Sequence, residues 1–153
     1  MDLNERIIHT TREVFAGMLG MEVTPEPPAD PGMTHVHSIS GIVGFAGRAR
    51  GMLAVHTPEK TALAITAGFL GLELSEINAD VKDAIGELAN MLAGSAKLSL
   101  AENSSEIRLS IPSVICGDSY TVNAPAEGHG LIIPFFISEG KFFVEFHLVE
   151  GGG

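Results

Sequence analysis

The length, composition and charge of the chain restrict what kind of protein it is. Its 153 residues suit one domain, and a hydrophobic fraction of 45% supplies a sizeable core, unlike the composition of a disordered chain. The formal net charge of −10 argues against binding to nucleic acid or to anionic membranes, since both are negatively charged. Cys116 is the one cysteine, so no intrachain disulfide forms, and no apolar run is long enough to span a bilayer. We therefore expect a cytoplasmic protein.

The N-terminal region is predicted to form a helix and then a loop. Residues 3–19 have apolar side chains at helical spacing, Asp2 or Asn4 is a suitable cap, and Gly20 stands where a helix commonly ends. Residues 24–34 contain four of the eight prolines, which is typical of an exposed loop.

A glycine-rich hairpin is predicted next. Residues 35–45 and 48–56 are strand-like and meet at Ala46-Gly47. The recurring glycines indicate a bent, closely packed pair of strands. They do not form a phosphate-binding loop, because neither a helix nor a Lys-Ser/Thr pair follows them directly.

Two helices are predicted in the middle of the chain. Thr57, Pro58 and Glu59 suit a cap, a first-turn proline and a first-turn acid, so a helix is expected from there to Leu70, before Gly71. After a loop, a longer helix is predicted from residue 79 to residues 100–101.

The rest of the chain is predicted to be β-structure, with a short flexible tail at 151–153. Its strand-like ranges are 107–116, 119–124, 131–138 and 141–149. The last two flank Glu139-Gly140, a pair suited to a type I′ turn. The order of elements has no βαβ alternation running through it. It predicts an α+β fold with a mainly antiparallel sheet and helices packed on one face, in a single domain over residues 1–150.

The long helix carries an unusual stripe of residues, which we call the polar stripe. On a helical wheel its members fall within roughly 80° of one another. They are Asp83, Glu87, Asn90, Gly94 and Lys97. Asparagine is a poor helix former, and a mid-helix glycine costs about 1 kcal/mol relative to alanine. A requirement other than helix stability is therefore a candidate explanation for Asn90 and Gly94.

The sequence around this stripe has an internal echo. Residues Glu13–Gly20, the first copy, align without gaps with Glu87–Gly94, the second copy. Each copy has a glutamate at its start and a glycine seven residues later, and each is associated with a hairpin. Ala16 stands where the second copy has Asn90. The echo predicts a pseudo-twofold repeat in which only the second copy keeps the carboxamide.

Other kinds of site have weak support in the sequence. His35 and His37 alternate on one strand and could share a face, but no metal-binding spacing is present, so the histidines are interpreted as surface or edge residues. Cys116 lies in an apolar strand and is expected to be a small buried hydrophobe. Asp83 and Glu87 lie on one convex helix without an aromatic cleft, which disfavours a glycosidase-type pair.

Glu87 and Asn90 are the remaining candidates. At i,i+3 they project side by side from the helix. Asparagine cannot act as a general base near neutral pH, but its amide can orient a water molecule, and the glutamate could grip a lysine of a partner. The alternative is a solvent-exposed polar pair on a helix that is purely structural.

The segment around this helix resembles the signature of the CheC/CheX/FliY phosphatases. Their motif is Asp or Ser, three residues, Glu, two residues and Asn, with a proline further along; here it falls on Asp83, Glu87, Asn90 and Pro112. The CheX branch is the better match. The supporting segments read GIVGFAG, RGMLAVHTPEKTALAI, IPSVI and LIIPFFISEGKFFVEFHL, and the resemblance covers most of residues 3–149.

The resemblance implies a CheC-like fold and a phosphatase that acts on the phosphoaspartate of a CheY-type response regulator. It implies that Asn90 positions the attacking water and that Glu87 pairs with the regulator's active-site lysine. Gly94 would let the partner approach, and Asp83 and Lys97 would lie at the rim. The Mg²⁺ belongs to the regulator, so no cofactor of the chain's own is expected, and the resemblance implies a homodimer.

Two alternatives to the phosphatase stay open. A non-enzymatic binding module of the flagellar-switch type shares this fold, and it would form a complex without changing the lifetime of the phosphoryl group. A small-ligand sensor would need an enclosed apolar pocket, and the sequence does not point to one.

Overall fold

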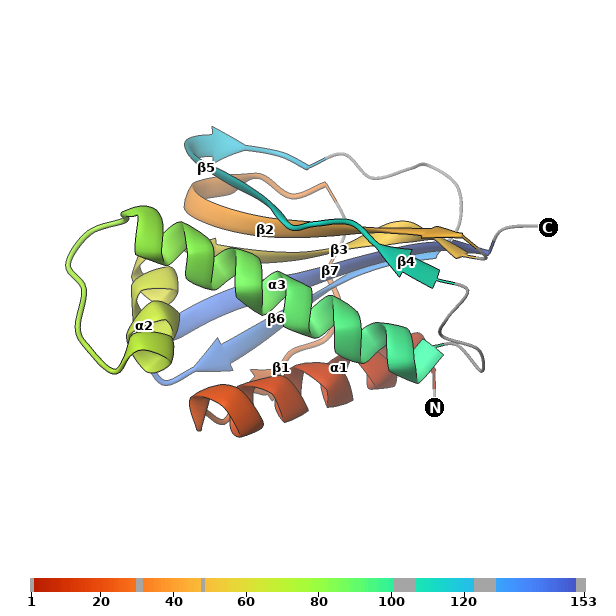
Figure 1. Ribbon diagram of the computed structural model, residues 1–153, viewed down its shortest axis with the longest axis horizontal. Helices are drawn as coiled ribbons and strands as arrows, with labels where there is room; N and C mark the ends of the chain where they lie inside the picture. Colours follow the sequence, from red (N-terminus) through yellow and green to blue (C-terminus); the bar gives the residue numbers. More distant parts are fainter. Residues whose placement is uncertain (1, 30–31, 48, 101–106, 123–128, 151–153) are drawn as a thin grey trace.

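The computed structural model of the protein describes residues 2–29, 32–47, 49–100, 107–122 and 129–150 (Figure 1). The elements in chain order are α1 (Leu3–Val14), the π-helix η1 (Phe15–Leu19), β1 (Thr24–Pro25), β2 (His35–Gly47), β3 (Ala49–Pro58), α2 (Glu59–Leu70), α3 (Ala79–Leu100), β4 (Ile107–Leu109), β5 (Ser113–Tyr120), β6 (His129–Ile137) and β7 (Gly140–Glu150). None of the helices in these ranges is long and apolar enough to cross a membrane.

All seven strands join one antiparallel sheet. The strand order is β1-β6-β7-β3-β2-β4, and β5 also pairs with β2, on the edge that β4 occupies further along. The helices lie on one side of this sheet (Figure 1), so the predicted α+β fold is confirmed. The hairpins β2–β3 and β6–β7 lie side by side through the pairing of β3 with β7. This arrangement is compatible with a pseudo-twofold relation between the two halves, which stays a prediction.

The main core lies between the sheet and the helices. Alternation along the strands turns every second side chain toward the helices. The strand residues buried there include Ile39, Val43, Leu53, Val55, Phe142, Val144 and Phe146. Helix α3 contributes Ile85, Leu88 and Leu92, which are fully buried. These residues lie on the side of α3 opposite the polar stripe, so core packing decides which face of the helix is left for solvent.

Gly41 of β2 lies under α3 at a point of very close approach. A Cβ placed on Gly41 would lie 2.8 Å from the carbonyl oxygen of Ile85 and 3.0 Å from the Cβ of Ala89. Any other residue would push the helix away from the sheet. The predicted close packing of the glycine-rich hairpin is therefore found here, and it fixes the height of α3 above the sheet.

Helix α1 begins with the predicted cap. The Asp2 side chain accepts a hydrogen bond from the backbone N–H of Glu5 at 2.8 Å, and the Glu5 side chain accepts one from the backbone N–H of Asp2 at 3.4 Å, which makes a capping box. After Val14 the helix continues as the π-turn η1. It ends at Gly20, whose φ of 63° is left-handed.

The predicted start of α2 is wrong by one residue. Thr57 belongs to β3, and its hydroxyl donates a hydrogen bond to the carbonyl of Ile39 at 2.8 Å. Because that hydroxyl is used within the sheet, Pro58 takes the cap position and no side chain caps the helix. The predicted end is confirmed, since Gly71 adopts a φ of 70°.

Two β predictions need correction. The range 107–116 is not one strand, because the chain breaks at Ser110–Pro112 and β5 then runs on through Gly117 to Tyr120. Proline has no N–H to continue a ladder, and the backbone N–H and carbonyl of Gly44 are bound by Ser110. The predicted separate strand 119–124 is also wrong, because residues 119–120 are the end of β5 and residues 121–122 are not in a strand. Residues 123–124 and the predicted tail at 151–153 lie outside the described residues.

The turn between β6 and β7 is Ser138-Glu139 and not Glu139-Gly140. Gly140 already pairs with Ile137 in the ladder. A Cβ on Gly140 would lie 2.6 Å from the Thr61 hydroxyl oxygen, so this glycine serves a close approach to α2. The turn prediction failed because a contact with a distant helix, and not the turn geometry, accounts for the glycine.

The proline-rich segment and Cys116 also differ from expectation. The segment is not simply a loop, since β1 pairs with β6 and the N–H groups of Glu26 and Ala29 donate to carbonyls of Pro134 and Ile132 at 2.9 and 2.8 Å. Cys116 is exposed, because most side chains of β5 face solvent. Its predicted burial is wrong.

Candidate active site on helix α3

The polar stripe of α3 lies on the solvent side of the helix. The buried side is occupied by core residues such as Leu88 and Leu92. On the stripe, Asp83 and Glu87 are exposed, whereas Asn90, Gly94 and Lys97 are partly exposed. The structure therefore brings the predicted site residues onto one outward face, and their individual roles stay predictions.

Glu87 and Asn90 are not engaged by their own chain. No hydrogen bond or ion pair joins either side chain to another residue in the part of the chain that the structure describes. An asparagine in a helix interior costs helix stability, and here no internal hydrogen bond compensates for that cost. The carboxylate and the carboxamide are therefore free to bind a partner molecule.

Gly94 leaves open space beside Asn90. A Cβ on Gly94 would meet no atom within 4 Å, so packing within the chain does not require glycine at this position. A glycine that no internal contact requires, on an exposed helix face, is suited to the close approach of another surface.

The connection between β4 and β5 borders the stripe. A Cβ on Gly86 would lie 3.2 Å from Cγ2 of Val114 and 3.8 Å from Cβ of Pro112, so this connection packs against the helix one residue before Glu87. Ile111, next in the chain to Pro112, is 86% exposed. An exposed apolar side chain beside a polar stripe is a common composition for a protein-binding surface.

Chemically, this face offers groups that can position a water molecule and a cation. The stripe contains no serine, cysteine or histidine that could act as a nucleophile. It lies on the outward side of a helix. An amide that orients water and a carboxylate that binds a cationic group are what it offers to a reaction centre on a second protein.

Comparisons with known proteins identify the family of the chain. A sequence profile described as chemotaxis phosphatase CheX matches residues 39–136, which include α3 as far as Leu100 and Pro112. The chain belongs to the CheX family. The CheY-P phosphatase CheX of Thermotoga maritima is 26% identical over 153 residues, covering 95% of each protein.

Solved structures of CheX proteins share the fold. The chemotaxis protein CheX from Desulfovibrio desulfuricans is 30% identical, with a TM-score of 0.84 over 97% of this chain and 100% of the other. A CheX–CheY–BeF₃–Mg²⁺ complex from Borrelia burgdorferi is 23% identical, with a TM-score of 0.76 over 97% of this chain and 99% of that one. At that identity the second comparison supports the fold alone.

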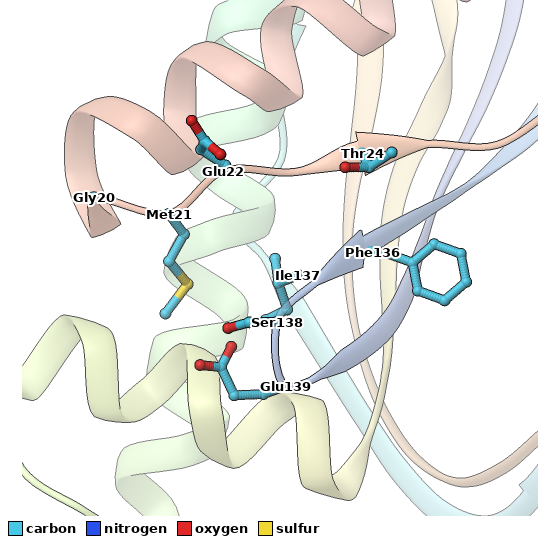
Figure 2. Close-up of a pocket in the computed structure, with 8 residues that line it drawn as sticks. All are labelled: Gly20, Met21, Glu22, Thr24, Phe136, Ile137, Ser138 and Glu139. Carbon is cyan, nitrogen blue, oxygen red and sulfur yellow. The ribbon is translucent and has the colours of Figure 1, made fainter.

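A pocket of about 590 Å³ lies away from the stripe of this CheX-family chain, near the end of η1 (Figure 2). It is lined by Gly20, Met21, Glu22, Thr24, Phe136, Ile137, Ser138 and Glu139. In Figure 2 the side chains of Glu22 and Phe136 point in different directions and do not converge on one point. Among the labelled polar side chains, those of Ser138 and Glu139 lie close together, and that of Glu22 lies apart from them (Figure 2).

The interpretation of the histidines as surface or edge residues is wrong for three of them. His35, His56 and His147 are buried and gather around Glu145. His35 and His37 also do not share a face, because His35 is buried whereas His37 is exposed beside Asp118. The alternation breaks at His37, whose φ of 44° is left-handed. These residues are brought together by the pairing of strands that are distant in the chain. No local sequence pattern predicts that pairing.

Proposed function

We propose that this protein removes the phosphoryl group from the phosphoaspartate of a CheY-type response regulator. The observation that carries the proposal is the unpaired, outward-facing Asn90 beside Glu87 in a chain of the CheX family. The Thermotoga relative is named as a phosphatase of CheY-P, and the Borrelia CheX was crystallised with CheY, BeF₃ and Mg²⁺. Both names support a phosphorylated regulator as the substrate here.

In this mechanism Asn90 acts on a water molecule. Its carboxamide enters the regulator's active site and holds the water in line with the bond between phosphorus and the aspartate oxygen. The water oxygen forms the new bond to phosphorus, the aspartate oxygen leaves with the electron pair, and the water protons pass to phosphate and solvent. Asparagine does not take the proton, so the rate gain comes from alignment and from electrostatic fit.

Glu87 has a different role in the proposal. Its carboxylate pairs with the regulator's active-site lysine, which holds the two surfaces in register. The net charge of −10 favours the approach of a lysine-bearing surface. Asp83 and Lys97 lie at the rim, Gly94 leaves clearance, and the Mg²⁺ is bound by the regulator and not by this chain.

The deciding experiment measures loss of acid-labile phosphate from a panel of phosphorylated response regulators, with and without this protein. We expect acceleration for at least one regulator, and at least an about hundredfold loss of that acceleration in Asn90→Ala. The variant should fold normally, because alanine is the better helix former.

Two outcomes would contradict the proposal. Acceleration at the parent rate by Asn90→Ala would exclude the water-positioning role. Complex formation with a phosphorylated regulator, without any change in phosphate lifetime, would instead identify a binding module of the flagellar-switch type.

We also propose that residues 1–150 form one domain and that the protein is a homodimer, as its resemblance to CheX implies. Light scattering during size-exclusion chromatography tests the second statement. A mass twice that of one chain supports the dimer, and the mass of a single chain rejects it.

A further inference from the structure

A buried polar cluster lies on the side of the sheet away from the helices and from the polar stripe. We call His35, His56, Glu145 and His147 the histidine cluster. None of the four is more than 6% exposed. Strand register places Ser40, His56 and Phe143 side by side on one face, and Glu145 and His147 follow Phe143 on that face. The curled ends of β2 and β5 lie on this side of the sheet (Figure 1).

A continuous series of short hydrogen bonds runs through the cluster. His56 Nε2 lies 2.9 Å from Glu145 Oε1, and His147 Nε2 lies 2.7 Å from Glu145 Oε2. On the other side of the ring, His56 Nδ1 lies 2.6 Å from the Ser40 hydroxyl, which is itself 2.6 Å from the Tyr120 hydroxyl. Both nitrogens of His56 and both oxygens of Glu145 therefore have partners, which fixes their orientation.

His35 joins the cluster because of an unusual backbone conformation. The left-handed φ of His37 interrupts the alternation of β2, so that His35 falls on the side of Ser40 and His56. The rings of His35 and His56 stack with centroids 3.8 Å apart and planes 17° apart. A left-handed non-glycine residue costs roughly 1–2 kcal/mol, and such conformations concentrate at functional sites.

The surroundings of Glu145 and His35 shift the pKa values of both groups. Burial acts to raise the pKa of Glu145, but the N–H groups of His56 and His147 outweigh this and hold its pKa below the ordinary value. Burial, together with the nearby His56, lowers the pKa of His35 to about 4, although Glu145 opposes the shift.

We propose that His35, His56 and Glu145 bind a divalent transition-metal ion, with Zn²⁺ as the best match. One ligand atom from each residue lies within 4.8 Å of the others. Zinc bonds of about 2.0–2.2 Å to nitrogen and oxygen put tetrahedral ligands about 3.4 Å apart, so a modest contraction and a turn of the His35 ring complete the site. Two histidines and a glutamate are an established zinc ligand set.

The surrounding hydrogen bonds fit a metal-bound state. If the ion takes His56 Nε2 in place of the proton shared with Glu145, then Nδ1–H donates to Ser40, and Ser40 donates to Tyr120. His147 keeps its hydrogen bond to the second oxygen of Glu145. Such outer partners orient metal ligands and raise their affinity. The ion would join β2, β3 and β7 on the sheet face that the helices leave uncovered.

The matched control is His9, which lies 3.0 Å from Glu13 on the surface of α1. His9 and Glu13 are the same two residue types as His56 and Glu145, but both are exposed. Tag-free protein is loaded with Zn²⁺ or Co²⁺, dialysed and analysed for metal per chain, and Co²⁺ binding is followed by its visible absorption. The comparison includes His35→Phe, which keeps a ring to stack on His56, Glu145→Gln and His9→Phe.

We expect one tightly held ion per chain and a raised melting temperature in the parent protein and in His9→Phe. His35→Phe and Glu145→Gln should each bind Co²⁺ at least about tenfold more weakly. If the parent binds no metal after dialysis, or if His35→Phe binds it equally well, the cluster is a hydrogen-bonded network only and the proposal is wrong. Absence of metal from the dialysed parent protein rejects the proposal even if both variants misfold.

Discussion

The two copies of the echoed sequence, Glu13–Gly20 and Glu87–Gly94, have different secondary structure. The second copy is regular α-helix throughout, and its glycine lies in mid-helix with open space around it. The first copy passes into the π-turn η1 and ends at its left-handed Gly20. The same spacing of glutamate and glycine therefore gives an uninterrupted helix face in one place and a helix end in the other.

The glutamates of the two copies also differ in their surroundings. Glu13 lies 3.0 Å from His9 on its own helix, whereas Glu87 has no ion pair with any described residue. Ala16 offers no group to orient water, and Asn90 does. Under the proposed function, an active face needs an uninterrupted helix and an unengaged carboxylate in addition to the carboxamide.

The sharpest test of this difference between the two copies moves the carboxamide from the second copy to the first. In the double variant Asn90→Ala, Ala16→Asn we expect phosphatase activity to stay at least about hundredfold below the parent, because the transferred carboxamide would follow an engaged glutamate and lie within a π-turn. Release of phosphate from a phosphorylated regulator measures this. Restored activity would mean that the asparagine alone makes the site.

A second comparison removes each glutamate in turn. Glu87→Ala should raise the regulator concentration for half-saturation about tenfold, equivalent to 1.4 kcal/mol, since it removes the partner of the regulator's lysine. Glu13→Ala serves as the control and should leave half-saturation unchanged. Equal effects of the two variants would show that general negative charge, and not a specific pair, attracts the regulator.

Substitution of the helix glycines should change stability and regulator binding only slightly. Gly94→Ala should stabilise the protein by about 0.5–1 kcal/mol, because the added methyl group meets no atom within 4 Å and restricts the unfolded chain. It should at the same time weaken regulator binding a few-fold. Gly17→Ala is the control, since a Cβ there also meets nothing. Thermal unfolding and half-saturation measure the two effects, and unimpaired binding by Gly94→Ala would remove the clearance argument.

The sequence predicted the features that depend on local periodicity and on the chain's own order. Helical spacing located α3 and its outward stripe, and hairpin order predicted the antiparallel sheet. The failures depend on contacts between distant segments. Gly140 looked like a turn residue but serves contact with Thr61, and the β4–β5 break follows from Ser110 binding Gly44. The histidine cluster was missed because its members come from three strands whose register no local pattern specifies.

The close contact at Gly41 links the sheet to the rate of the proposed reaction. Ala89, whose Cβ is so near to that position, is the residue before Asn90, yet Gly41 lies on the opposite side of the helix from any partner. In-line attack on phosphorus loses much of its rate when the reacting groups are misplaced by about 1 Å. In the proposed mechanism, the position of the carboxamide is thus set partly from inside the protein, by the spacing between α3 and the sheet at Gly41.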